Sequence, residues 1–411
     1  MLASVGGFQM LRFGQFWLVF ELTGSPLALG YVGLANGIPA IFLNLFGGLA
    51  ADRMDQRRLI IAAQGIVALL IFLLATVTLL DLVQVWHILV IAFLAGAVEA
   101  FDQPARRALL PHLVDRSVMM SAVALNSSIW PSTRIMAPAV AGFIIAGAGT
   151  AAALYVSGVG FLIMAVAAFT MRVPRVTRPA SGGAVHDLLE GLGFICQNPV
   201  LIFLVAMTFF NSFFGMAYVT LMPVFAVDIL KVGANGQGLL LGIGGVGSLI
   251  TTIWLAARGD AGSKGLLIIG GSIMSGLSVA AFALTAQYVG SFALAMFLMA
   301  ATSVFNTLSN TALQSTMQLI TPDQIRGRVM GFYGMTYNIR PLGAVQAGAV
   351  AGVFGAPLAI AAGGFAVVLF TLGAPLLSRR VRRLDRALTE AEQEQLAANQ
   401  EAGKSTTTAD D

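Results

Sequence analysis

The sequence predicts an all-α membrane protein with twelve transmembrane helices, arranged as two pseudo-symmetric bundles of six helices. First, 57% of the 411 residues are hydrophobic and 10% are charged, whereas a soluble domain has about 25% charged residues. Second, the apolar residues fall in blocks of about 20, the length at which a helix crosses the ~30 Å hydrocarbon layer. Third, the second half of the chain repeats unusual features of the first half.

The apolar blocks follow one another along the chain with short polar turns between them. Met1 lies inside the first block, and because a first membrane helix normally has a polar lead-in, we expect the natural start to lie upstream of it. In order, the expected spans are residues 1–22, 27–50, 59–80, 86–103, 119–146, 151–171, 199–222, 237–256, 265–286, 290–310, 328–354 and 357–377.

The cationic side chains orient these spans, because Lys and Arg collect in cytoplasmic loops. With the N-terminus inside, 19 of the 23 Lys and Arg residues fall in cytoplasmic segments, and only Lys231 falls outside. We therefore expect a multi-pass protein of the bacterial cytoplasmic (inner) membrane with both termini in the cytoplasm. The net charge of +4 follows from this topology, so no nucleic-acid partner is expected.

The longest cytoplasmic linker divides the spans six and six. Its later part, Val185 to Ile195, alternates apolar and polar residues like a helix that lies on the membrane surface. The expected domains are an N-terminal bundle (1–171), a cytoplasmic linker with a surface helix (172–198), a C-terminal bundle (199–377) and a cytoplasmic tail (378–411).

Shifting the second half back by 203 to 207 residues aligns its unusual residues with those of the first half. Such a duplication is typical of transporters in which two bundles rock about a site near the bilayer midplane. The aligned pairs are Arg134 with Arg340, Glu21 with Asp228, Arg53 with Arg258, and the Pro138 region with Pro341.

The turn between the second and third spans resembles the signature loop of the major facilitator superfamily, Gly-x-x-x-Asp-Arg-x-Gly-Arg-Arg. Asp55 replaces the usual Gly, and Gln56 replaces an Arg. The resemblance implies the major facilitator fold and a gate that locks the cytoplasmic side while the transporter faces outward. A topology anchor that merely stays in water is the alternative. The implied gate residues are Gly48, Asp52, Arg53, Arg57 and Arg58.

Ala137, Pro138, Ala141 and Gly142 in the fifth span resemble the antiporter motif of the same superfamily, Gly-Pro-x-x-Gly-Gly, with Ala at two Gly positions. A proline frees a backbone carbonyl and small neighbours permit close helix contact. The resemblance favours export over uptake, and an ordinary proline kink is the alternative.

Further segments resemble the branch of the superfamily that contains the enterobactin exporter and macrolide efflux proteins. This resemblance implies a monomeric secondary transporter that exports drug-like or siderophore-like molecules by alternating access and proton antiport. An uptake symporter and a transport-inactive receptor or scaffold are the alternatives. No Walker phosphate loop is present, so we expect the energy to come from an ion or substrate gradient instead of ATP hydrolysis. We expect neither an enzyme nor a cofactor. The segments are Glu21–Gly30, Gln103–Val114, Pro199–Leu201 and Ile325–Gly331.

Ionisable side chains inside spans are functional candidates, because each costs about 3 kcal/mol or more unless it is paired or hydrated. Arg12, Arg134 and Arg340 would give the cavity a positive potential and favour an anionic substrate. Alternatively, each Arg is neutralised locally and only braces the bundle. Asn211 and Asn306 are further cavity candidates, although span asparagines also hydrogen-bond between helices.

Proton coupling requires a carboxyl group that can gain and lose a proton during transport. Glu99 is the first candidate and Asp102 the second, with Glu21 and Asp228 on the outer side. Asp102 has a structural alternative, since Arg106 follows four residues later and can pair with it.

Neither the Cys and His residues nor a glycine-rich motif in the eighth span predicts a bound ligand. Cys196 is the only cysteine and the three histidines are far apart, so no metal site is expected. Gly242, Gly244 and Gly247 satisfy G-x-G-x-x-G but lie inside the eighth span, so they predict a helix-contact surface instead of a dinucleotide site.

Overall fold

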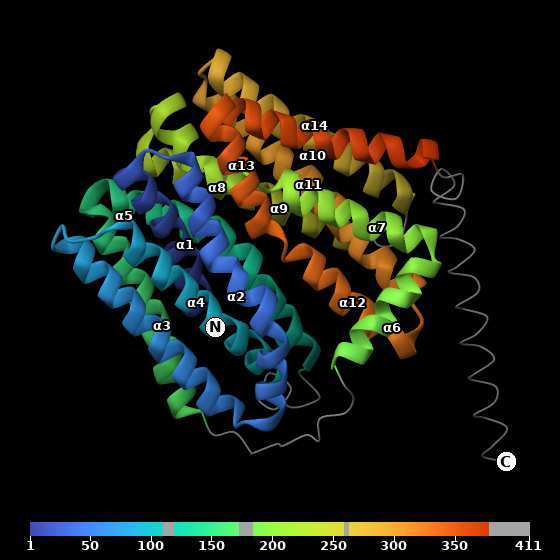
Figure 1. Ribbon diagram of the computed structural model, residues 1–411, viewed down its shortest axis with the longest axis horizontal. Coiled ribbons are helices and arrows are strands. Elements are labelled where there is room, and N and C mark those ends of the chain that lie inside the picture. The colour runs from blue at the N-terminus through green and yellow to red at the C-terminus, as the bar shows by residue number, and fades with distance from the viewer. Residues whose placement is uncertain (110–118, 172–183, 259–262, 378–411) are drawn as a thin grey trace.

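The computed structural model describes residues 1–109, 119–171, 184–258 and 263–377, and every regular element in these ranges is a helix (Figure 1). The first half consists of α1 (Leu2–Thr23), α2 (Pro26–Arg53), α3 (Gln56–Leu79), α4 (Val85–Leu109) and α5 (Met119–Thr170). The linker contains α6 (Ala184–Gln197). The second half consists of α7 (Pro199–Phe210), the π-helix η3 (Asn211–Gly215), α8 (Tyr218–Val224), the π-helix η4 (Phe225–Ile229), α9 (Gly233–Arg258), α10 (Lys264–Tyr288), α11 (Phe292–Ile320), α12 (Asp323–Tyr337), α13 (Arg340–Phe354) and α14 (Ala356–Leu377).

Local sequence explains where several helices begin. Ser25 caps α2, because its hydroxyl accepts a hydrogen bond from the Ala28 amide, and Pro26 follows at the first helical position. Asn198 and Pro199 start α7 in the same way, with the Asn198 side chain accepting from the Val200 amide at 2.9 Å. Each cap satisfies a backbone donor that the first turn of a helix leaves unpaired.

Backbone turns repeat between the two halves. Gly24 ends α1 with φ 59°, and Lys231 has φ 55° between η4 and α9. Gly149 and Gly355 share a positive-φ conformation, with φ of 85° and 87°, that glycine adopts without strain. Asp81 and Gly290, at φ 56° and 65°, complete three pairs that are 206 to 209 residues apart. The duplication inferred from charged residues and prolines therefore extends to the turns at one end of the bundle, which we call the Gly24 end. The opposite end contains the turn at Asp55, and we call it the Asp55 end.

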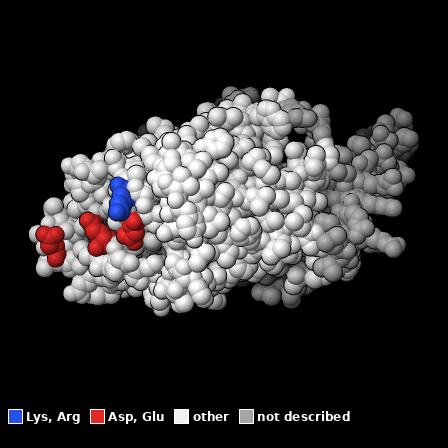
Figure 2. Space-filling view, turned by 90° about the horizontal axis from the view of Figure 1, so that it is seen from above, with Lys and Arg blue, Asp and Glu red and all other residues white. Residues whose placement is uncertain are grey.

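By length and hydropathy, nine helical segments within the described ranges can cross a membrane. Ile129–Thr170 is counted as one segment, although Gly149 breaks it into the two spans expected there. The eleventh span, 328–354, was expected to be one continuous helix, and this is wrong. The structure has two helices there, because α12 ends at Tyr337 and α13 starts at Arg340. The count of twelve stays a prediction. Figure 2 shows a surface that is largely free of charged side chains, as lipid contact requires.

The two halves share two buried clusters toward the Gly24 end and have separate cores at the Asp55 end. The larger shared cluster joins Leu29 of α2 with Leu221 of α8 and Ala347 of α13. The smaller shared cluster joins α1 and α5 with Ala234 of α9. At the Asp55 end, one cluster lies within α3, α4 and α5, and another lies within α6, α7, α10, α11 and α12. In Figure 1 the two groups of helices meet near α8 and α13 and diverge toward the α2–α3 turn on one side and toward α6 and α12 on the other.

Candidate functional site

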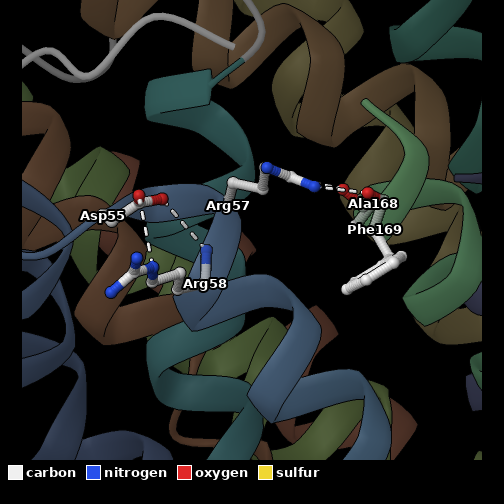
Figure 3. Close-up of polar contacts among 5 residues, drawn as sticks. All are labelled: Asp55, Arg57, Arg58, Ala168 and Phe169. Carbon is white, nitrogen blue, oxygen red and sulfur yellow. Dashed lines mark hydrogen bonds and ion pairs between the residues drawn. The ribbon is translucent and has the colours of Figure 1, made fainter. Parts of the chain in front are cut away.

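The signature-like loop is tied to the first half of the protein. Asp55 caps α3, because its Oδ1 accepts a hydrogen bond from the Arg58 amide at 3.1 Å. The Arg57 guanidinium donates to the carbonyls of Ala168 (2.9 Å from Nε) and Phe169, at the end of α5 (Figure 3). Arg57 thus joins the start of α3 to the last turn of α5, where a cation also offsets the helix dipole.

The other implied gate residues are less constrained. Arg58 is largely exposed and its Nε lies 3.8 Å from Asp55 Oδ2. A Cβ added to Gly48 would meet no atom within 4 Å, so nothing in this conformation requires glycine there. The side chains of Asp52 and Arg53 lie outside the described residues, as does that of Arg258, which the repeat pairs with Arg53. The gate function of this loop stays a prediction.

We expect Arg57→Ala to destabilise the protein by about 2 kcal/mol, because it removes two charge-assisted hydrogen bonds and leaves the helix carbonyls unpaired. Arg58→Ala should stay near wild type, since the cap uses its backbone amide and the side-chain pair is long and exposed. Thermal unfolding in detergent, followed by circular dichroism, measures both. Equal melting temperatures for the two variants would contradict the role of Arg57.

The antiporter-like motif lies where the first half packs against α9. Gly142 approaches the Ala234 carbonyl so closely that an added Cβ would overlap it. Facing it, a Cβ on Gly238 would lie 2.5 Å from the Pro138 carbonyl oxygen. Ala137 and Ala141 are buried in the same contact. The backbone of α5 departs from helical geometry only at Gly149, so neither Pro131 nor Pro138 breaks the helix.

Glycines make a second contact between the halves, where α2 meets α13. A Cβ on Gly348 would lie 2.6 Å from the Pro26 carbonyl oxygen, and the Pro341 ring lies directly against Gly37. Together with the α5–α9 contact, this seam closes the Gly24 end. Small residues allow both approaches, as expected for helices that pack within lipid.

The G-x-G-x-x-G glycines form the helix-contact surface predicted for them. Gly242 faces Ile135 of α5, whereas Gly244 and Gly247 face Ser303 and Ala300 of α11. A Cβ on Gly244 would lie 2.6 Å from the Ser303 hydroxyl. The motif therefore contacts both halves through α9.

Three of the intramembrane charges interact across the centre of the protein. Arg12 of α1 is exposed and lies over the Phe8 ring, 4.4 Å from its centroid. Its guanidinium interacts electrostatically with the Glu99 carboxylate on α4 and with Arg340 at the start of α13. Arg12 thus connects a proton-coupling candidate of the first half with a cavity candidate of the second. Arg134 takes part in no hydrogen bond or ion pair with the residues that the structure describes.

Asp102 pairs with Arg106, the structural alternative that the sequence leaves open. Asp102 Oδ2 lies 2.6 Å from Arg106 Nε, and both side chains are largely buried. Arg106 also donates to Ser4, and the Ser4 hydroxyl donates to Gln64 at 2.7 Å. Asp102 Oδ1 is buried without a hydrogen-bond partner. A cavity of about 190 Å³ between α1, α3, α4 and α5 is lined by these residues and by Glu99.

The polar cavity candidates of the second half are bonded to each other. Asn306 of α11 donates to Asn211 of η3 at 3.0 Å, and Asn310 donates to Asn306 at 2.9 Å. Asn211 begins a π-helical turn, a distortion that occurs often at functional sites. Phe209, Phe210, Phe213 and Phe214 form a contiguous aromatic cluster around this turn.

Sequence reasoning missed the break between α12 and α13. It places Arg340 at the first turn of a new helix, at the positive dipole end of α13. Discontinuous helices of this kind form ion and substrate sites in transporters. Pro341, which the repeat singled out, was the available signal, because proline favours the first turn of a helix.

The outer carboxylates lie apart from this central group, at the Gly24 end. Glu21 and Asp228 are both exposed. Thr150, just after the Gly149 break, donates to Glu21 Oε2 at 3.1 Å. Among the described residues, no cluster of three or more His, Cys, Asp or Glu is arranged to bind a metal ion.

These features agree with a comparison of the whole chain with known families. The model of the family described as "Transmembrane secretion effector", a branch of the major facilitator superfamily, matches residues 1–404. The chain belongs to the transmembrane secretion effector family. As a transmembrane secretion effector, the protein is a multi-pass membrane transporter and not an enzyme.

Curated relatives align with this secretion effector over most of their length. Macrolide efflux protein A of Streptococcus pyogenes is 23% identical, over 92% of this chain and 93% of the relative. The staphyloferrin A transporter of Staphylococcus aureus is 23% identical, over 90% and 92%. The multidrug efflux pump Tap of Mycolicibacterium fortuitum is 26% identical, over 88% and 87%.

Solved structures identify the fold of this secretion effector. The nucleoside transporter NupG (D323A mutant) superposes with a TM-score of 0.70 at 15% identity, covering 91% of this chain and 98% of that one. The D-xylose-proton symporter gives a TM-score of 0.70 at 15% identity, covering 91% and 95%. The protein therefore has the major facilitator fold.

Proposed function

We propose that the protein exports small drug-like or siderophore-like molecules from the bacterial cytoplasm by alternating access, coupled to proton antiport. The names of its relatives support export, since they include a macrolide efflux protein, a multidrug efflux pump and a siderophore transporter. The siderophore and drug relatives differ in chemistry, so the shared property is export of small organic molecules.

The arrangement of the hydrophobic cores is the observation that carries alternating access. Two buried clusters join the halves toward the Gly24 end, whereas each half has its own core at the Asp55 end. This conformation would receive substrate from the Asp55 end. Gly48 agrees with a second conformation in which a helix packs against it, because in this one an added Cβ meets no described atom within 4 Å.

The distribution of charge supports a cytoplasmic location for the Asp55 end. Arg57, Arg58, Arg326 and Arg328 lie near turns at this end, whereas Lys231 is the one cation of the described turns at the Gly24 end. We therefore place both termini in the cytoplasm, with the Gly24 end facing outward across the cytoplasmic membrane. A monomer suffices for this mechanism, because both halves belong to one chain.

The charges at the centre support an anionic substrate and a proton as the coupling ion. Arg12 and Arg340 repel each other electrostatically, so an anion between them would relieve that repulsion. Glu99 faces Arg12 from α4 and would compete with the substrate for this cation. Protonation of Glu99 would free Arg12, which offers a physical link between proton binding and substrate binding.

Transport into inverted membrane vesicles tests this function. With an acidic lumen, we expect accumulation of a radiolabelled macrolide or of an anionic siderophore, and collapse of the gradient by an ionophore should abolish it. Vesicles without the protein are the control. Gradient-driven loss from preloaded inverted vesicles would instead indicate an uptake symporter. Candidate substrates come from comparing a strain that lacks the gene with its complemented strain, for drug susceptibility and for exported metabolites. If the vesicles transport none of these compounds, a receptor or scaffold is favoured.

A further inference from the structure

The linker helix α6 is packed against α12 and not merely against the membrane surface. Ile195 of α6 is buried in the same cluster as Val329 and Tyr333 of α12. Figure 1 shows α6 and α12 side by side, away from α2 and α4. The sequence predicted the helix but not its attachment, since an amphipathic pattern does not specify which surface the apolar side covers.

Two contacts fix α6 to α12 at one point. A Cβ on Gly191 would lie 2.9 Å from the Arg328 carbonyl carbon, so the helix backbones touch there. At the residue before Gly191, Glu190 Oε1 lies 2.5 Å from Arg328 Nη1. Gly193, two residues further along α6, has no neighbour within 4 Å of an added Cβ.

The same segment of α12 also holds the end of α11. Arg326 Nε donates to the Gln318 carbonyl at 3.0 Å, and Arg326 Nη2 donates to the Thr321 carbonyl at 3.3 Å. The Ile325–Gly331 segment, which the sequence singled out without a role, therefore links α6, α11 and α12 into one unit. At its other end, α12 packs through Tyr333 into the cluster with α7, α10 and α11 and then ends at the break before Arg340. Beyond the break, α13 packs against α2 of the first half.

We propose that α6 is a brace for α12, and that Gly191 and Glu190 are positioning residues for the transport step. Because α12 is separated from α13 by the break, the brace makes it move with the second half when the Asp55 end opens and closes. Without the brace, α12 would keep its contacts with α7 and α11 alone, so its position would vary more and closure would fail in part of the molecules. This proposal rests on transport by alternating access.

Gly191→Ala tests the brace, and Gly193→Ala is its matched control on the same helix. The distance probe uses the full chain with Cys196→Ser, Met54→Cys and Gly331→Cys, since Met54 is exposed and Gly331 has open space around it. Spin labels at these two positions report the separation of α12 from the α2–α3 turn. This distance is measurable whether or not a substrate is known.

We expect Gly191→Ala to broaden the Met54–Gly331 distance distribution and to lower the maximal transport rate about fivefold or more, with KM unchanged. Gly193→Ala should match wild type in both measurements. An unchanged distance distribution in Gly191→Ala overturns the proposal, even where transport falls. If the wild-type protein transports nothing, the proposed function fails, whereas the distance result still decides whether α6 positions α12.

Charge reversal provides a second test that adds no atoms to the helix contact. Glu190→Arg should repel Arg328 and broaden the same distance distribution, with transport reduced about two- to fivefold. Combining it with Arg328→Glu should restore both values. A double variant that is no better than the single variant would overturn the contribution of this ion pair.

Discussion

Gly142→Val is expected to abolish net transport, because it separates the two halves at the Gly24 end. Even a Cβ at this position overlaps the Ala234 carbonyl, and backbone atoms cannot move aside as a flexible side chain can. Overpacking of this kind costs about 1–3 kcal/mol, which moves a two-state equilibrium by about 5- to 150-fold. The protein should therefore shift away from the conformation with a closed Gly24 end.

Gly147→Val is the control, since Gly147 lies on the same helix with no neighbour within 4 Å of an added Cβ. Substrate uptake into inverted vesicles measures transport, and labelling of a cysteine introduced near Pro26 measures opening of the Gly24 end. Gly238→Ala, on the facing helix, should open it in the same way. Equal transport by Gly142→Val and Gly147→Val would show that this seam need not close.

Glu99→Gln is expected to remove proton-driven accumulation while substrate exchange continues. Glu99 faces Arg12 of α1 and lies near Asp102 and Arg106 on its own helix. Of these, Asp102 and Arg106 are already paired with each other. Glu99 is thus the carboxylate whose charge controls Arg12, and an amide cannot alternate between charged and neutral forms.

Proteoliposomes with an imposed pH gradient separate the two activities, because accumulation needs the gradient and exchange does not. Asp81→Asn makes the same carboxylate-to-amide change at an exposed turn, where asparagine also accepts the positive φ, and should behave as wild type. Accumulation by Glu99→Gln with unchanged proton stoichiometry would eliminate Glu99 as the coupling group.

Most of the fold follows from patterns that act over one helix or one turn. The apolar blocks specify the helices, and the glycine spacing in α9 correctly predicts a contact surface. The pairing of Asp102 with Arg106 follows from one turn of helix. Each of these features is determined by neighbours in sequence, so a single sequence contains enough information to predict it.

The features that were missed depend on neighbours from other parts of the chain. The break after Tyr337 ends a helix that is more polar than the other helices, and Pro341 packs against Gly37 of the opposite half. Asp55 stands where the signature loop usually has a glycine, and the sequence showed this only as a departure from the motif. In the structure the Asp55 carboxylate caps α3. The electrostatic interaction of Arg12 with both Glu99 and Arg340 joins residues from three helices, which no local spacing can reveal.

The unequal distribution of the cores makes the cycle energetically asymmetric. Opening the Gly24 end would expose apolar side chains that both halves bury together, at about 25 cal/mol for each Å². In this conformation the Asp55 end buries no shared surface of this kind, because each half keeps its own core there. In the proposed cycle, opening the Gly24 end is therefore a step that exposes this buried surface, and energy from the ion gradient would be used there.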